Sequence, residues 1–557
     1  MLSILTIILI IADVAVLILT MIGFFSKWLK WCVPILIIIS LLHLIIDGFY
    51  QTLIPVYAIT IILIALCAFR WKQPESKSGL HTIRIIWAVL WRLICVAGLG
   101  LAILGIWTFG NSPRIVSALL FERSNHNFSS LGWSEAFDEM NDLLEKDYAF
   151  GEWKAIDWES LHAQYREEII AAEKANDTAA YYLALRNYAY SFPDGHVEIE
   201  GNDFGLRDAA IGGGFGFAAI QMDDGKVVAH ILEENSPATE AGMKWGAEII
   251  SWNYIPVQTA IDNVSLLWAY SPPATNEGIK ITKLCLLTRA PVGTSVSITF
   301  RNPDETEVRQ VSLTAIDDNY STYDKASYMG DLTFESYLIW EILPDDYGYI
   351  QIVGEQLYPP INPVGEVRKA VKEFIAADVP GVILDLRVNV GGYDEMAPMM
   401  MSFFATEPLF YELFSMKDTQ SGNFHSTGEL SVEPSSPSYT GQVVMLVSNN
   451  TISTGEGFPL IMQSLDRGPV LGFYGTNASF GIKQGKVTMP GGYTVHYPNG
   501  AALDENGNIL LDSDYTLTGG VVPDMTVPID METLKAMFFD ERDVLVEEAI
   551  AIMERNK

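Results

Sequence analysis

The stretch Val382-Ile-Leu-Asp-Leu-Arg-Val-Asn-Val-Gly-Gly392 decides the fold of this 557-residue chain. Its first five residues are apolar enough for a strand buried on both faces, which is typical of parallel sheets covered by helices. Two glycines then permit a tight turn that exposes consecutive backbone N–H groups. Such groups at a sheet edge can stabilise the charge that develops on a carbonyl oxygen under attack. The stretch therefore predicts an α/β core with an oxyanion-stabilising turn.

A second segment, Asn449-Asn-Thr-Ile-Ser453-Thr-Gly-Glu-Gly-Phe458, follows another apolar run, Val443-Val-Met-Leu-Val447. A serine between a strand and a helix is exposed and lies at the positive end of the helix dipole. A serine at a helix start is by itself more often an N-cap than a nucleophile. Together with the glycine turn, however, the segment predicts a nucleophilic serine.

The preceding residues fall into a helical part and a β part. Apolar residues recur at helical spacing from Trp133 to Leu144 and from Leu161 to Ile169. This part closes with Phe192-Pro-Asp-Gly-His196, in which Pro and Gly mark a turn and place His196 on a loop. A glycine loop, Gly212-Gly-Gly-Phe-Gly-Phe217, then begins a region of strands.

The β part resembles the circularly permuted PDZ module of bacterial proteases, through this glycine loop, Asn235-Ser-Pro-Ala-Thr-Glu-Ala-Gly242 and Trp245-Gly-Ala-Glu-Ile-Ile250. The resemblance implies that the glycines leave backbone amides free for a peptide's terminal carboxylate, while the next strand pairs with the peptide. An unrelated small β-domain is the alternative.

Taken together, these segments resemble the tail-specific, or C-terminal processing, serine peptidases. That family carries a "DLRxNxGG" strand end and a later "SASE", matched here by Asp385–Gly392 and Ser453-Thr-Gly-Glu456. A tail motif matches at Gly520-Val-Val-Pro-Asp524. The resemblance implies a crotonase-like ββα core, Ser453 as nucleophile, and oxyanion amides from Gly391 or Gly392 and from Thr454.

The general base differs between branches of this family. The lysine-using branch has a lysine in a stretch matched here by Gly475–Gly481, which contains none; Lys483 and Lys486 come too late. The tricorn-core-like branch uses a histidine at the position of His196, and an imidazole can both accept and return the serine proton. The serine that precedes that histidine is Gly195 here. No carboxylate is in register as the third group; Asp512 and Asp514 are the nearest candidates.

The first 110 residues hold four apolar stretches, at about 2–25, 31–46, 52–69 and 85–109. Their length and composition predict four transmembrane helices. Basic residues in the loops after the first and third stretches place both loops in the cytoplasm. The sequence thus predicts a multi-pass cell-membrane protein with an extracytoplasmic catalytic region. The predicted parts are four transmembrane helices (1–110), a linker (111–130), a helical N-terminal subdomain (131–204), the PDZ-like module (205–315) and the peptidase core (316–557).

The composition of the chain argues against several classes of partner and cofactor. The chain has 35 basic and 68 acidic side chains, and its net charge of −33 argues against nucleic acid, which needs a positive surface. Only one of the four cysteines, Cys285, follows residue 110, so no intrachain disulfide is expected there. The scattered histidines fit no metal site, and no cofactor is expected.

These observations predict a membrane-anchored serine endopeptidase that cleaves polypeptides, with C-terminal tails as candidate substrates and the lipid bilayer as a partner. One alternative is a catalytically degenerate ligand- or peptide-binding protein on the same fold. Another takes the apolar helices as the functional centre, because Asp13, His43 and Arg92 fall in or near them.

Overall fold

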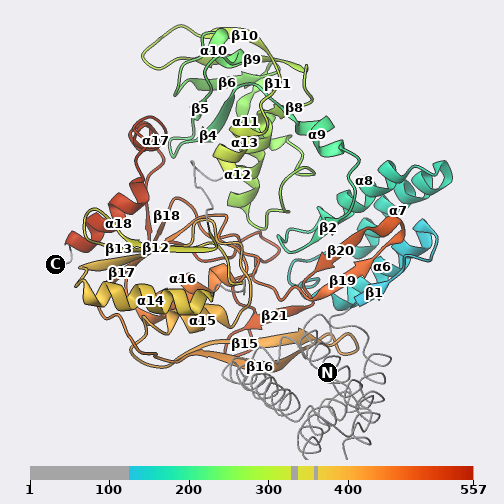
Figure 1. The fold of residues 1–557 in the computed structure, drawn as a ribbon. Coiled ribbons are helices and arrows are strands. Elements are labelled where there is room, and N and C mark those ends of the chain that lie inside the picture. Colours follow the sequence, from blue (N-terminus) through green and yellow to red (C-terminus); the bar gives the residue numbers. More distant parts are fainter. Residues whose placement is uncertain (1–124, 328–335, 357–361, 556–557) are drawn as a thin grey trace, which may run out of the picture. The chain divides into compact units, whose positions relative to one another are not determined.

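The computed structural model describes residues 125–327, 336–356 and 362–555 (Figure 1). The chain divides into two compact units, 1–123 and 124–557, and the described residues belong to the second. The four predicted transmembrane helices lie outside the described residues.

The helices of the described part are not membrane helices. Within these ranges, none combines the length and the apolar character that a membrane crossing requires. The longest of them, α7 (Trp158–Ala175), carries charged side chains along its whole length. This finding contradicts the predicted fold class, with its four transmembrane helices, and the predicted location in the cell membrane. The fold that the structure supports is an α/β fold.

Three helices and a small sheet share one core near the start of the described chain. The helical spacing of the sequence is confirmed in α6 (Trp133–Asp147) and α7, and α8 (Thr178–Ala189) follows. Their buried faces pack on a four-stranded sheet in the order β1-β19-β20-β2. Its strands are β1 (Asn125–Asn127), β19 (Gly485–Thr488), β20 (Thr494–Tyr497) and β2 (Glu198–Glu200). The loop that carries His196 therefore lies between a helix and a strand of one shared core.

A β module follows, built on a sheet in the order β10-β9-β6-β5-β4, with β7 paired to β6. A second sheet, β11-β3-β8, contains the glycine loop. The strands are β3 (Gly213–Gly214), β4 (Phe217–Gln221), β5 (Val227–Leu232), β6 (Glu248–Trp252), β7 (Ile255–Pro256), β8 (Arg289–Ala290), β9 (Ser295–Arg301), β10 (Arg309–Thr314) and β11 (Ile316–Asp317). The helices are α9 (Leu206–Ile211), α10 (Pro237–Glu240), α11 (Val257–Asp262), α12 (Asn276–Leu287) and α13 (Ser321–Ser327).

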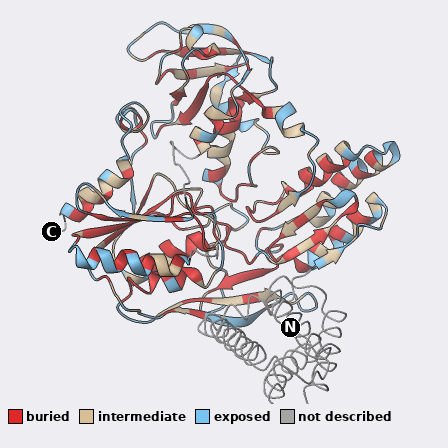
Figure 2. Cartoon of the chain, in the orientation of Figure 1, coloured by how far each residue is buried: buried red, intermediate tan, exposed pale blue. Residues whose placement is uncertain are grey.

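The peptidase core is a sheet in the order β12-β13-β14-β17-β18-β22, parallel except for β12. Alternate residues of β14 face opposite layers: Val382 and Leu384 join the cluster with α14, and Ile383 joins the cluster with α18. Figure 2 shows the central strands buried, as their apolar runs predicted. The strands are β12 (Leu338–Ile342), β13 (Gly348–Ile352), β14 (Gly381–Asp385), β17 (Gln442–Val447), β18 (Val470–Gly472) and β22 (Met525–Thr526).

Helices α14 (Pro363–Ala376), α15 (Met396–Met401) and α16 (Thr454–Leu465) cover one face of this sheet, and α18 (Val544–Arg555) covers the other. A three-stranded sheet in the order β16-β15-β21 packs beside α15 and α16. The remaining elements are β15 (Leu409–Lys417), β16 (Phe424–Val432), η2 (Pro490–Gly492), β21 (Gly500–Leu503) and α17 (Met531–Phe538). The boundaries of the predicted domains stay a prediction.

Candidate active site

The candidate site lies where the parallel strands end. Because β14, β17 and β18 run in the same direction, the segments that follow them emerge at one edge of the sheet. The glycine turn follows β14, the serine segment follows β17, and the stretch Gly475–Gly481 comes after β18. The fold therefore brings together the two motifs that the sequence singled out.

A buried ion pair holds the end of β14. The Arg387 guanidinium bonds to both oxygens of Asp385, with Nη2 2.6 Å from Oδ2, and it also reaches Asp543. Tyr349 donates its hydroxyl hydrogen to the same Asp385 carboxylate. Burial would raise the pKa of Asp385, but the Arg387 charge and these hydrogen bonds lower it. Asp385 therefore stays ionised and fixes the strand end from which the glycine turn begins.

Asn389 connects the glycine turn to the serine segment. Its side chain accepts the N–H of Gly391 at 2.8 Å and donates to Ile352 O and to Glu355 Oε1. Its backbone carbonyl accepts the N–H of Ile452, the residue before Ser453, at 3.0 Å. One buried side chain thus sets both the shape of the turn and its position relative to the serine.

Ser453 does not have the geometry of an ordinary N-cap. It precedes α16, yet its side chain makes no capping hydrogen bond, whereas Ser236 before α10 accepts the N–H of Thr239. Its backbone is at φ 59° and ψ −137°, a conformation that is costly for any residue except glycine. Such strain is typical of positions where the surrounding structure presents one side chain in a fixed direction.

The Ser453 side chain faces the glycine turn. A Cβ placed on Gly391, which has φ +78°, would lie 2.5 Å from Ser453 Cβ and 3.0 Å from Oγ. Gly391 therefore has to be a glycine for two reasons, its φ and its proximity to the serine. Its N–H is already donated to Asn389. Within the described residues, no hydrogen bond engages the N–H of Gly392 or of Thr454.

Ser479 connects the serine segment to the histidine loop. Its carbonyl accepts the N–H of Ser453 at 3.0 Å, and its hydroxyl accepts the N–H of Gly195 at 2.8 Å. A Cβ on Gly195 would lie 2.8 Å from Ile452 Cδ1, so the two segments pack directly against one another. The structure thus brings together the neighbourhoods of Ser453 and His196. A link through a carbonyl leaves no signal in a sequence, and we did not predict it.

Glu456 holds the stretch that contains Ser479. Its carboxylate accepts the N–H groups of Ala478 and Ser479 at 2.8 and 2.9 Å, and the hydroxyl of Thr476 at 2.5 Å. Burial raises the pKa of Glu456 to about 7, although these hydrogen bonds oppose the rise. The glutamate of the "SASE" match is therefore a positioning group, and its place in that motif was the available signal.

His196 is buried on its loop, and its backbone N–H donates to Asp194 Oδ1 at 2.9 Å. Burial lowers the pKa of the imidazole to about 4, although the nearby Asp194 charge raises it. Its Nδ1 has no hydrogen-bond partner among the described residues. The ring is consequently neutral at neutral pH, as a proton acceptor must be.

Asp512 and Asp514, the two candidates for the third catalytic group, differ in burial and in hydrogen bonding. Asp514 is half-buried, and its carboxylate accepts the N–H groups of Thr516 and Thr518 in its own turn. The buried Asp512 has no partner for either oxygen in the described part, and burial raises its pKa well above the usual value. Lys483, the first lysine after this stretch, forms an ion pair with Glu198 at 2.7 Å.

Comparison with known proteins agrees with this geometry. Residues 346–527 match the family described as peptidase family S41. The crystal structure of mature CPAF is similar to this chain with a TM-score of 0.55 at 15% identity, covering 76% of this chain and 98% of CPAF. The structure of mature CPAF complexed with lactacystin gives a TM-score of 0.52 at 14% identity, covering 76% and 99%. At sequence identities this low, the similarity to these two structures shows a shared fold.

The match in residues 346–527 identifies the chain as a serine peptidase. The family whose model matches is peptidase family S41, and the match covers residues 346–527.

Proposed function

We propose that this chain is an endopeptidase in which Ser453 is the nucleophile, His196 the general base, and the N–H groups of Gly392 and Thr454 form the oxyanion hole. Ser453 Oγ attacks the scissile carbonyl carbon while His196 takes the hydroxyl proton. The oxygen that becomes negative is stabilised by the two N–H groups, which no acceptor among the described residues engages. His196 then returns its proton to the leaving amine, and water hydrolyses the acyl-enzyme. Gly391 supplies space for the serine rather than a hydrogen bond.

One observation carries this proposal. The backbone of Ser453 is strained, and its side chain makes no capping hydrogen bond. In addition, Ser479 forms hydrogen bonds both with Ser453 and with the loop that holds His196. A structural N-cap would use its hydroxyl and would need no unusual backbone. The substrates that fit are polypeptides, and those with an accessible C-terminal tail suit the β module.

Labelling of the full chain by a serine-reactive fluorophosphonate tests the nucleophile. Ser453→Ala is expected to abolish labelling and to lower cleavage of an unstructured protein by about 10³-fold or more, without change in the unfolding midpoint. The matched control is Ser236→Ala, which removes a helix cap and costs about 1 kcal/mol of stability but leaves labelling intact. Labelling of the Ser453→Ala protein at the parent rate would refute the assignment.

Two buried histidines allow the same comparison for the base. His196→Gln is expected to slow labelling by about 10²-fold or more, because no other group takes the proton. His230 of β5 in the β module is also buried, and burial lowers its pKa to about 3. Its ring packs edge-on against Phe538 of α17. His230→Gln should leave labelling unchanged. Equal rates for the two variants would remove His196 from the mechanism.

A degenerate binding protein on the same fold is the second candidate, favoured by the unpartnered Nδ1 of His196. A base without an orienting group is held less well during proton transfer. Steady turnover of an unstructured protein, lost in Ser453→Ala, would exclude this candidate. Binding of the same protein without cleavage would support it.

A further inference from the structure

The side chain of Thr454 links the two segments that supply the proposed oxyanion hole. Thr454 is the first residue of α16, and it is fully buried. Its Oγ1 lies 2.7 Å from Asp394 Oδ1 and 3.2 Å from the carbonyl oxygen of Gly392. The two residues whose N–H groups we assign to the oxyanion hole are therefore also connected through a side-chain hydroxyl.

This hydroxyl is a departure from the motif that the serine segment matches. The second position of "SASE" is an alanine, whose methyl group forms no hydrogen bond, and this chain has Thr454 there. Its partner Asp394 lies 60 residues earlier, just beyond the end of the "DLRxNxGG" match at Gly392. The contact between Thr454 and Asp394 is therefore not implied by either motif and belongs to this chain's own version of the site.

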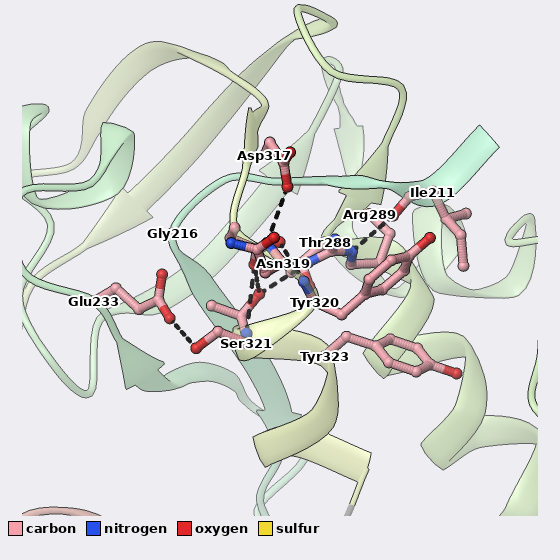
Figure 3. A network of polar contacts seen from close by, with 12 residues as sticks. Ile211, Gly216, Glu233, Thr288, Arg289, Asp317, Asn319, Tyr320, Ser321 and Tyr323 are labelled. Atoms are coloured by element: carbon pink, nitrogen blue, oxygen red, sulfur yellow. Dashed lines mark hydrogen bonds and ion pairs between the residues drawn. The ribbon is translucent and has the colours of Figure 1, made fainter. Parts of the chain in front are cut away.

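Asp394 also differs from a buried carboxylate that is held by an arginine. Figure 3 shows the polar contacts around Arg289 in the β module. There Asp318 accepts the Arg289 Nη1 hydrogen at 2.8 Å, and both side chains are almost completely buried. Within the described residues, Asp394 has no ion-pair partner, and its carboxyl is bound by the hydroxyl of Thr454. Charge pairing does not explain a carboxyl group at this place, whereas the contact with the threonine does.

The link is available to both protonation states of Asp394. Burial raises the pKa of Asp394, and the hydrogen bond from Thr454 opposes the rise. An ionised carboxylate accepts the hydroxyl hydrogen of Thr454 at 2.7 Å. A protonated carboxyl can instead donate to Thr454 Oγ1, while the threonine donates to the carbonyl of Gly392 at 3.2 Å. The threonine hydroxyl therefore keeps a partner in the glycine-turn segment in either state.

A second buried carboxyl, that of Glu412 in β15, lies near Asp394. Burial raises the pKa of Glu412 well above its usual value, and the charge of Asp394 adds to the rise. Neither carboxyl oxygen of Glu412 has a hydrogen-bond partner among the described residues. Glu412 thus shares the surroundings of Asp394 without a hydrogen bond to Thr454, which makes it a matched control.

We propose that Asp394 is a positioning residue for the oxyanion hole, because it holds the Thr454 hydroxyl and so fixes the N–H of Thr454 relative to that of Gly392. This inference rests on the proposed function. Donors stabilise an oxyanion most when they are already in place before the attack. Without Asp394, the hydroxyl loses its nearer partner at a point where the backbone of Ser453 is already strained. The loss is therefore expected in the rate of the chemical step and not in binding.

The concentration dependence of fluorophosphonate labelling tests this on the full chain, because saturation separates the maximal rate from the half-saturating concentration. Asp394→Ala is expected to lower the maximal rate by about 10- to 30-fold and to leave the half-saturating concentration within about twofold. Asp394→Asn, whose side-chain oxygen still accepts the Thr454 hydrogen, should recover the rate to within about threefold of the parent. Thr454→Val, which removes the hydroxyl but keeps the shape, should match Asp394→Ala, and the double variant should be no slower than either.

The control is Glu412→Gln, for which no change is expected. A parent-like maximal rate in both Asp394→Ala and Thr454→Val would overturn the positioning role. Additive losses in the double variant, or an equal loss in Glu412→Gln, would overturn it as well. Should Asp394→Ala fail to fold, as judged by its unfolding midpoint, Thr454→Val decides. A failure of the proposed function shows itself differently, since labelling would then persist in Ser453→Ala.

Discussion

Two glycine turns in this molecule begin from the same expectation and end in different states. Both were predicted to present free backbone amides to a carboxylate or an oxyanion. At the turn Gly391-Gly392, the neighbouring side chain is Ser453, and the N–H of Gly392 stays unengaged within the described residues. At Gly213-Gly214, strands on both sides pair with the glycines, and a Cβ on Gly214 would lie 2.6 Å from Asp318 Oδ2.

The difference teaches that glycine makes a close approach possible without determining what approaches. At the first turn, Asn389 takes the N–H of Gly391 and leaves the next one unengaged. At the second, a segment about 100 residues further along the chain closes over the loop. In each case the neighbour of the turn comes from a remote part of the sequence.

The largest effect is expected from placing a methyl group on each turn. Gly391→Ala puts a Cβ 2.5 Å from Ser453 Cβ at a positive φ, so we expect fluorophosphonate labelling to fall by about 10³-fold. Gly214→Ala puts a Cβ beside Asp318 and Arg289 and should leave labelling within about threefold, while loosening the segment over the loop. Labelling rates of the two folded proteins measure this directly. Comparable losses in both variants would mean that the turns do not have separate roles.

A smaller effect is expected from removing the asparagine that shapes the active turn. Asn389→Ala leaves Gly391 N–H and Glu355 without their partner, which should cost about 1–3 kcal/mol of stability and slow labelling about 10²-fold. The matched control, Asn302→Ala, also removes a buried side-chain amide. In the β module this amide accepts the N–H of Lys244 and donates to the carbonyl of Gly242. The control variant should cost similar stability without slowing labelling. Thermal unfolding and labelling together test the pair, and a rate loss that merely follows stability would contradict the positioning role.

A third effect concerns pH. Since burial lowers the pKa of His196 to about 4, its neutral form persists on acidification well below the ordinary histidine value of about 6.5. The pKa of Glu456, raised by burial to about 7, predicts a separate, shallow decrease as the pH falls through 7. Labelling rates from pH 8 to 3 should therefore show a step of a few-fold near 7 and a second decrease with its midpoint near 4. Glu456→Gln should lack the upper step. A complete loss centred on 6.5 would place His196 in a more exposed setting than the structure gives it.

Local pattern explains what could be predicted. The apolar run of β14, the helical spacing of α6 and the glycine turn each follow from a few neighbouring residues, and each is confirmed. Ser479 and Asp394 act through hydrogen bonds between distant segments, which no local pattern records. The membrane helices were predicted from the length and apolar character of four stretches, and none of the helices in the described residues has that combination.

The smallest effects are expected at the two carboxylates that the sequence left open as a third group. Asp514 binds the N–H groups of its own turn, so Asp514→Asn should cost at most about 1 kcal/mol and leave labelling unchanged. Burial raises the pKa of Asp512 well above the usual value, which favours its uncharged form, and Asp512→Asn is close to isosteric with that form. We expect labelling to change by less than about threefold, because a neutral acid adds little to the stability of an imidazolium. A loss of about 10²-fold in Asp512→Asn, with Asp514→Asn unaffected, would instead make Asp512 the group that orients His196, and would require it to ionise when substrate binds.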